Sequence, residues 1–240
     1  MNVFTKIGKD LTLSQEIEKK IESAIINKTF IPGEKLPTEN EMCKMFAVSR
    51  TALREALKML SAKGLIKIRK GSGTYVEEFD PSFAVNSMGT FLELNFDKEY
   101  ISHIIEMRKI LEPNIAKLAA KYRSNNDLIN LKNNLTELEN CSLSDYQKQG
   151  IIDKDFHMLI AQSANNPMIP IIVEPIFNIM PKIRMMVYAE VKQAHNTALT
   201  YHKLIVEKIE QQEEDGSLNA MTEHLRLAEE HSKIISNKLN

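Results

Sequence analysis

Residues 38–60 contain two short helical patterns that are separated by only three residues, and so tight a connection leaves few folds open. Thr38 is followed three residues later by Glu41, which predicts a helix that starts with a capping box. This helix ends near Phe46, and Ser49 predicts the N-cap of the second helix. Two helices joined by such a short turn form a helix-turn-helix.

A basic hairpin follows the second helix. Residues 66–69 alternate isoleucine with a cation, which is the period of a half-buried strand. Gly71 and Gly73 permit a turn with positive φ, and Tyr75 begins a returning strand. Upstream, Ser14 predicts the cap of a further helix. Three helices and a hairpin in this order predict a winged helix-turn-helix.

The net charge of −1 for the whole chain conceals a basic segment. Residues 1–79 carry a net charge of +4, and Glu55 is the only acidic residue against eight Lys and Arg residues between positions 44 and 76. Three of these cations recur at every fourth position of the second helix, so they line one ridge: Arg50, Arg54 and Lys58. This local excess of positive charge indicates a surface that binds a polyanion.

The predicted elements match the shape of double-stranded DNA. Guanidinium groups at positions 50 and 54 can pair with guanine in the major groove, and Thr51 can contact phosphate or a thymine methyl group. Lys70, beside the glycine tip of the hairpin, can enter the neighbouring minor groove. A solvated basic face would explain the charges but not the order of the elements, so we predict a DNA-binding domain.

The remaining chain contains only helical patterns. Residues 77–83 include a proline and predict a linker, beyond which no strand pattern is present. We expect a mainly α protein with a winged helix-turn-helix at residues 1–78, a linker and connecting helix at 79–95, and an all-α bundle at 96–240. The bundle would bind an effector and form the dimer.

Cysteine usage and hydropathy predict a cytoplasmic protein. Cys43 and Cys141 are isolated, which indicates neither a disulfide framework nor a zinc knuckle. The N-terminus lacks the apolar stretch of a signal peptide. The most apolar region, residues 168–180, is too short to span a bilayer, so no membrane association is expected.

Four residues of the helical region are candidate metal ligands. Asp153 and His157 are four residues apart and project from one helical face, while His202 and His224 lie in later helical segments. Together they could bind a divalent transition metal. Histidines near apolar faces are also common as hydrogen-bonded core residues, so spacing alone leaves both interpretations open. His103, His195 and His231 have no partner at a useful spacing.

The sequence of residues 35–76 resembles the winged helix-turn-helix of GntR-type bacterial transcription regulators, through its "LPTE", "VSR", "REAL" and "GSGTYV" elements. The resemblance implies that the helix contacts to DNA are Arg50, Thr51 and Arg54, and that the wing contacts lie at 70–73, which includes Gly71 and Gly73. Asn40 stands where the family usually has arginine, and Ala52 where proline or threonine is frequent. Operator preference therefore need not match that of relatives.

The second region resembles the FCD-type effector domain of the FadR branch of these regulators. The matching segments are "EMRKILEPNIAKLAA" (106–120), "DKDFH" (153–157) and "SANNP" (163–167). The resemblance implies a divalent metal, such as zinc, nickel or manganese, with these ligands: Asp153, His157, His202 and His224. Asn165 replaces the usual glycine, and asparagine tolerates the left-handed conformation that the turn needs.

Two arginines are candidate contacts for an effector carboxylate. By the same resemblance, Arg108 would face the pocket, and Arg184 is a second candidate. An exposed Arg108 paired with Glu112, four residues on, is the alternative.

The favoured hypothesis is a ligand-responsive transcription regulator rather than an enzyme. A homodimer would bind a pseudo-palindromic DNA operator, and a small carboxylate such as a sugar acid would be the effector. A metal-dependent hydrolase with an accessory nucleic-acid domain is the rival, but no motif places a general base near the metal. A regulator that binds acyl-CoA without metal is a third possibility, which the complete ligand set disfavours.

Overall fold

The computed structural model describes residues 11–78 and 80–236, so the parts of the two expected domains at 1–10 and 237–240 lie outside it. The chain divides into two compact units, residues 1–83 and 84–240. The division falls within the stretch 79–95 that the sequence assigns to a linker and connecting helix.

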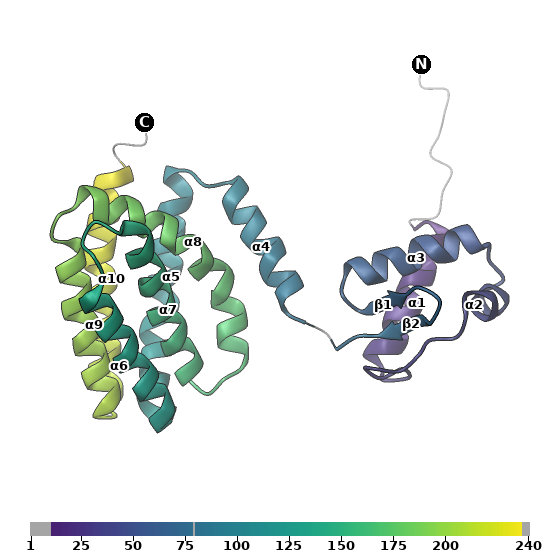
Figure 1. The fold of residues 1–240 in the computed structure, drawn as a ribbon, viewed down its shortest axis with the longest axis horizontal. Helices are drawn as coiled ribbons and strands as arrows, with labels where there is room; N and C mark the ends of the chain where they lie inside the picture. The colour runs from purple at the N-terminus through teal and green to yellow at the C-terminus, as the bar shows by residue number, and fades with distance from the viewer. Residues whose placement is uncertain (1–10, 79, 237–240) are drawn as a thin grey trace, which may run out of the picture. The chain divides into compact units, whose positions relative to one another are not determined.

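The first unit is a three-helix domain with a two-stranded hairpin (Figure 1). Its elements are α1 (Leu13–Ile26), α2 (Glu39–Phe46), α3 (Arg50–Ala62), β1 (Ile66–Arg69) and β2 (Gly73–Val76). The strands are antiparallel, with Ile66 opposite Val76 and Arg69 opposite Gly73. One apolar core joins the elements: Ile17, Ile21, Leu36, Met42, Leu53, Ala56, Leu57, Leu60, Ile66 and Val76.

The helix caps explain where the helices of this unit begin. Thr38 and Ser49 accept hydrogen bonds from the backbone of α2 and α3, as the sequence predicts. The predicted cap of α1 was wrong. Thr12, rather than Ser14, accepts from the backbone N–H of Gln15, whose side chain accepts from the Thr12 N–H in return. Ser14 is buried inside the first turn, because this capping box starts the helix two residues earlier.

The predicted half-buried alternation of β1 holds at Ile66 but not at Ile68. Ile66 is buried, whereas the side chain of Ile68 is 49% exposed. Both residues point to the same face of the hairpin because they are two positions apart. Ile68 lies closer to the tip, and the apolar core covers the face only as far as Ile66.

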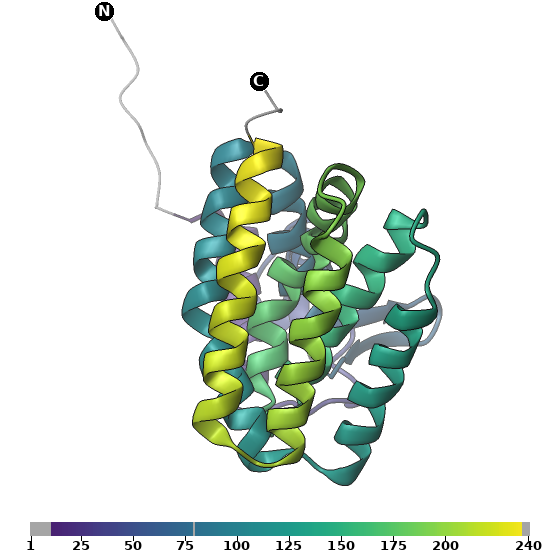
Figure 2. The same cartoon turned by 90° about the vertical axis from the view of Figure 1, so that its left-hand side faces the viewer.

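The second unit consists of helices alone, as expected for this region, over the residues that the structure describes. They are α4 (Ser82–Leu94), α5 (Lys98–Tyr122), α6 (Asn125–Asn140), α7 (Tyr146–Ser163), α8 (Met168–Glu190), α9 (Ala194–Glu210) and α10 (Glu214–Ser236). Figure 2 shows α10 alongside α5 and α9, and all three helices pack against one another. A turn at Asn165, with φ of 52°, separates α7 from α8.

Helices α7 and α8 approach each other closely at Gly150. A Cβ atom added at this position would lie 2.9 Å from the carbonyl oxygen of Pro181. Pro175 and Pro181 both lie inside α8 without ending it, although proline removes a backbone donor. Arg184 Nε of α8 donates to Asp153 Oδ2 of α7 at 2.8 Å between the same two helices. No helix among the described residues combines the length and the apolar character needed to cross a membrane.

Candidate functional site

The surface of α3 in the first unit carries the predicted DNA contacts. The side chains of Arg50, Thr51, Arg54 and Lys58 are all exposed. Residues on the opposite face of α3, such as Leu53 and Leu57, are buried in the core and hold the helix against α1. The predicted ridge is therefore presented to solvent on a rigid support.

Ion pairs neutralise part of the basic segment. Lys63 Nζ lies 3.0 Å from a carboxylate oxygen of both Glu18 and Glu22, which ties the end of α3 to α1. Arg54 Nε donates to Glu39 Oε2 at 2.9 Å. The positive surface is thus smaller than the count of Lys and Arg residues suggests, because Lys63 holds two helices together.

The hairpin tip needs both of its glycines. Gly71 has φ of 76°, a conformation that side chains rarely adopt, and no atom lies within 4 Å of where its Cβ would be. Gly73 has φ of 131°, and an added Cβ would lie 2.5 Å from Lys35 Cε. Lys70 is exposed at the same tip. The open space at Gly71 permits a close approach to another molecule.

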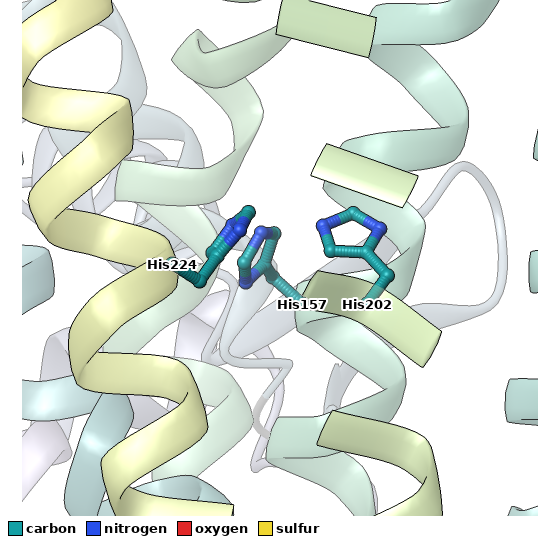
Figure 3. Close-up of side chains that lie close together, drawn as sticks. All are labelled: His157, His202 and His224. Atoms are coloured by element: carbon teal, nitrogen blue, oxygen red, sulfur yellow. The ribbon is translucent and has the colours of Figure 1, made fainter. Parts of the chain in front are cut away.

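A cluster of three buried histidines lies inside the second unit (Figure 3). His157 comes from α7, His202 from α9 and His224 from α10, and each offers a ring nitrogen within 4.8 Å of the others. The rings of His202 and His224 are 4.8 Å apart between centroids. Phe156 stacks on His202 at a centroid distance of 3.8 Å and fixes the plane of its ring.

Asp153 adjoins this cluster, one helical turn before His157. Its Oδ1 atom is 3.6 Å from His202 Nε2, and its Oδ2 atom is 3.8 Å from His157 Nε2. The carboxylate also accepts hydrogen bonds from Arg184 Nε at 2.8 Å and from the Tyr188 hydroxyl at 3.3 Å. The structure thus brings together all four residues that the sequence suggests as ligands.

The chemistry of the cluster fits a divalent transition metal. Among the described residues, both ring nitrogens of His202 and the Nδ1 atom of His157 are buried without a hydrogen-bond partner, which is costly unless another group uses them. Burial lowers the pKa of His202 and of His224 well below the usual value, so both rings are neutral. Neutral imidazole nitrogens beside a carboxylate are the donors that zinc, nickel and manganese accept.

Arg108 is buried next to the cluster. Its Nη2 atom lies 3.0 Å from His157 Nε2, while the rest of its guanidinium group pairs with Glu112. Glu112 Oε2 in turn lies 2.6 Å from His157 Nδ1. The sequence left open whether Arg108 faces the pocket or is exposed and paired with Glu112. In the structure it pairs with Glu112 but is fully buried.

Arg184 is the second buried arginine of the site. Besides its bond to Asp153, its Nη2 atom lies 3.4 Å from His224 Nε2. Glu112 and Tyr188 complete the polar interior, but sequence reasoning did not assign them to the site. Only their helical spacing from Arg108 and Arg184, four residues in each case, could have indicated them.

The buried acids of the site are ionised. Burial by itself would raise the pKa of Glu112, but the Arg108 guanidinium and the His157 imidazole lower it to about 2. Burial likewise opposes ionisation of Asp153, yet the charge of the Arg184 guanidinium group holds its pKa well below the usual range. Burial and the charge of Asp153 raise the pKa of Tyr188, which stays protonated.

The other three histidines have different surroundings. His195 Nδ1 pairs with Gln149 Oε1 at 3.0 Å, and its ring packs edge-on against Tyr188. His103 is exposed, and His231 is partly buried. His195 is thus a hydrogen-bonded core residue.

Comparison with protein families identifies both units. Residues 13–76 match the model of bacterial regulatory proteins of the gntR family, and residues 103–227 match the FCD domain. The chain belongs to the GntR family of transcription regulators. Its FCD domain contains the histidine cluster and both buried arginines, and its GntR domain contains the exposed ridge of α3.

Two curated proteins and one solved structure illustrate the relationship. The Uxu operon regulator of Haemophilus influenzae is 29% identical over 231 residues, which are 92% of this chain and 79% of that protein. The galactonate operon transcriptional repressor of Escherichia coli is 32% identical over 60% of this chain and 64% of its own. The structure described as Streptococcus agalactiae GntR has a TM-score of 0.64 at 24% identity, covering 90% of this chain and 99% of that one, and supports the fold.

This GntR-family chain is a ligand-responsive regulator of transcription and not an enzyme, as the sequence motifs favoured over a hydrolase. The regulator binds DNA through its winged helix-turn-helix and an effector through its FCD domain.

Proposed function

We propose that this regulator controls an operon for a small organic acid, which binds at the histidine cluster together with a divalent metal. The buried cluster of His157, His202 and His224, with Asp153 and two arginines beside it, carries the proposal. The printed name of the Escherichia coli relative, a galactonate operon repressor, supports a sugar acid as the class of effector.

The effector class follows from the donors inside the FCD domain. A divalent metal held by Asp153 and the three histidines would supply open positions for oxygen ligands of an acid. The guanidinium groups of Arg108 and Arg184 lie beside those ligands and offer paired donors for a carboxylate. The Tyr188 hydroxyl provides a further polar contact within reach of Asp153.

Elemental analysis of untagged protein tests the metal site. We expect about one zinc, nickel or manganese ion per chain in the unsubstituted protein, and loss of that ion in His157→Ala. His195→Ala is the matched control, because His195 is a buried histidine of the same domain that pairs with Gln149 outside the cluster. Absence of metal after incubation with each of the three ions would contradict the proposed site.

The DNA contacts that we propose are Arg50, Thr51, Arg54 and Lys58 on α3, with Lys70, Gly71 and Gly73 in the wing. Exposure of the α3 side chains and the open space at Gly71 support this assignment. Selection from a random DNA pool would yield the operator, which we expect to contain two inverted half-sites. Addition of a galactonate series should then change operator affinity in the unsubstituted protein but not in His157→Ala.

A homodimer would present two α3 helices and two wings to such an operator. Exposed apolar side chains on one face of α4 support a contact with a second copy: Met88, Phe91 and Leu94 are 51%, 49% and 82% exposed. Light scattering should give the mass of a dimer, and Leu94→Glu should give a monomer. Ile129→Glu, which changes a similarly exposed apolar residue on α6, is the control and should leave the dimer intact.

A further inference from the structure

The contact between Arg108 and His157 fixes which ring nitrogen carries the proton. A guanidinium group has only donors, so the 3.0 Å contact between Arg108 Nη2 and His157 Nε2 requires a lone pair on Nε2. Of the two ring nitrogens, Nδ1 is therefore the one that carries a proton, and it lies 2.6 Å from Glu112 Oε2 without hydrogen-bond geometry. The contact with Arg108 selects this tautomer.

In that tautomer the lone pair of His157 is on Nε2, which Arg108 contacts. The same lone pair is the one that His157 would offer to a metal. A nitrogen lone pair accepts one strong partner, so a hydrogen bond from Arg108 and coordination of a metal exclude each other at Nε2. Arg184 makes a similar contact with a second histidine of the cluster. Its Nη2 atom lies 3.4 Å from His224 Nε2, while its Nε atom donates to Asp153. Within the described part of the chain, arginines contact the Nε2 atoms of His157 and His224, whereas both ring nitrogens of His202 lack a hydrogen-bond partner.

We propose that Arg108 competes with the metal for the Nε2 atom of His157, and that metal binding releases its Nη2 group for the effector carboxylate. This inference rests on the proposed metal site and adds a regulatory step to it. Arg108 would lower the affinity for metal in the absence of effector. By linkage, an anion that engages the released guanidinium group would tighten metal binding by the same factor as metal tightens anion binding.

The surroundings of Arg108 permit this exchange. Its Nε atom pairs with Glu112, so the guanidinium group can leave His157 without losing its buried counterion. The hydrogen-bond contact of Nη1 within the described residues is with the weak acceptor Met180 Sδ, at 3.5 Å. Glu112 therefore acts as a positioning residue for Arg108.

Nitrogen-15 NMR of the unsubstituted, metal-free protein tests the starting state. Long-range proton–nitrogen spectra distinguish the two histidine tautomers and show whether a ring nitrogen bears a proton. We expect His157 to carry its proton on Nδ1 and to lack one on Nε2. A proton on Nε2 would overturn the proposal, because Arg108 cannot then donate to that atom.

Metal affinity measured with zinc alone, by competition with a fluorescent chelator, tests the competition itself. The double substitution Arg108→Met with Glu112→Gln removes one positive and one negative charge, so the net charge of the site is unchanged. The amide introduced by Glu112→Gln would still offer a carbonyl oxygen to His157 Nδ1. We expect this variant to bind zinc at least about tenfold more tightly than the unsubstituted protein.

The outcomes separate this inference from the proposed function. Unchanged or weaker zinc binding in a folded double variant, beside clear binding in the unsubstituted protein, would overturn the competition and leave the metal site standing. No zinc binding by the unsubstituted protein would overturn the metal site itself. The single variant Arg108→Met is measured as well. If it bound zinc more tightly but the double variant did not, the change in net charge would explain the tighter binding, and the proposal would be overturned.

Discussion

Arg54 and Glu39 form an ion pair on the exposed surface of the first unit, close to where the proposed DNA contacts lie. Exposed ion pairs contribute little to stability, so this carboxylate has no strong structural role. It does place a negative charge beside a guanidinium group that we assign to DNA. The pair therefore matters more for binding a polyanion than for folding.

We expect Glu39→Gln to strengthen binding to unrelated DNA severalfold, because it removes repulsion from phosphate and frees Arg54. Operator binding should change less, so discrimination between the two DNAs should fall. Titration of both duplexes at two salt concentrations would measure this, with a steeper salt dependence for the variant. Equal affinities of variant and parent for unrelated DNA would contradict the expected role of Glu39, and Glu55→Gln is a matched control on α3.

Single residues also show what the sequence could and could not predict of the site. The spacing of Asp153 and His157 indicated one helical face, and both side chains do lie beside His202 and His224. The roles of Glu112 and Tyr188 were not predicted, because their four-residue spacing from Arg108 and Arg184 is a weak signal that does not say whether the pairs are buried. Arg108 was ambiguous for the same reason, since a charged residue is rarely buried unless it is paired.

Among the elements, α7 and α8 set the geometry of the polar interior. Their backbones meet at Gly150 and Pro181, and Asp153 and Arg184 follow three residues later on each helix. The 2.8 Å bond between these two side chains joins the same two helices. A glycine inside a helix otherwise costs stability, and here it permits the close packing of the two backbones.

Gly150→Ala should separate α7 from α8, because its Cβ would lie 2.9 Å from the Pro181 carbonyl oxygen. We expect a loss of stability of about 1–3 kcal/mol, typical of overpacking, and weaker metal binding as Asp153 shifts. Urea unfolding and zinc titration would measure the two effects. Gly89→Ala on α4 is the control, since nothing lies within 4 Å of its added Cβ, and a harmless Gly150→Ala would refute this account of the packing.

Helix ends and helix type were largely predictable from local chemistry. Thr38 and Ser49 cap α2 and α3 because their side chains replace missing backbone acceptors. The exposure of Ile68 was not predictable, because it depends on how far the core extends along the hairpin. Continuation of α8 through two prolines also required the tertiary structure, since proline usually ends a helix.

For the whole molecule, the buried histidines make stability depend on pH. Burial lowers the pKa of His202 and His224 in the folded chain, so the unfolded chain binds protons first as the pH falls below about 6.5. Stability must therefore decrease toward acid. Glu112, with a pKa lowered to about 2, adds a contribution that is fully present above about pH 4.5 and lost as the pH falls toward 2.

Urea unfolding of metal-free protein, followed by circular dichroism at pH 7 and pH 5.5, would measure this dependence for the FCD domain. Each buried histidine should contribute up to about 1.4 kcal/mol per pH unit below its unfolded pKa. His103→Gln changes an exposed histidine outside the cluster and is the control, which should keep the same slope. A stability that is flat between these pH values would show that His202 and His224 are not shielded from solvent in solution.

The pairing of the buried charges has a consequence for which anions the regulator can accept. Arg108 faces Glu112 and Arg184 faces Asp153, so the interior carries two positive and two negative charges beside neutral rings. A divalent cation adds two positive charges to an interior that is otherwise neutral, and buried charge is costly without compensation. An anionic acid offsets this added charge, in part if it has one carboxylate, as galactonate has, and in full if it has two, whereas an uncharged sugar of the same size does not. The net charge of a compound, more than its shape, would thus decide whether it binds at this site, and uncharged sugars would be excluded.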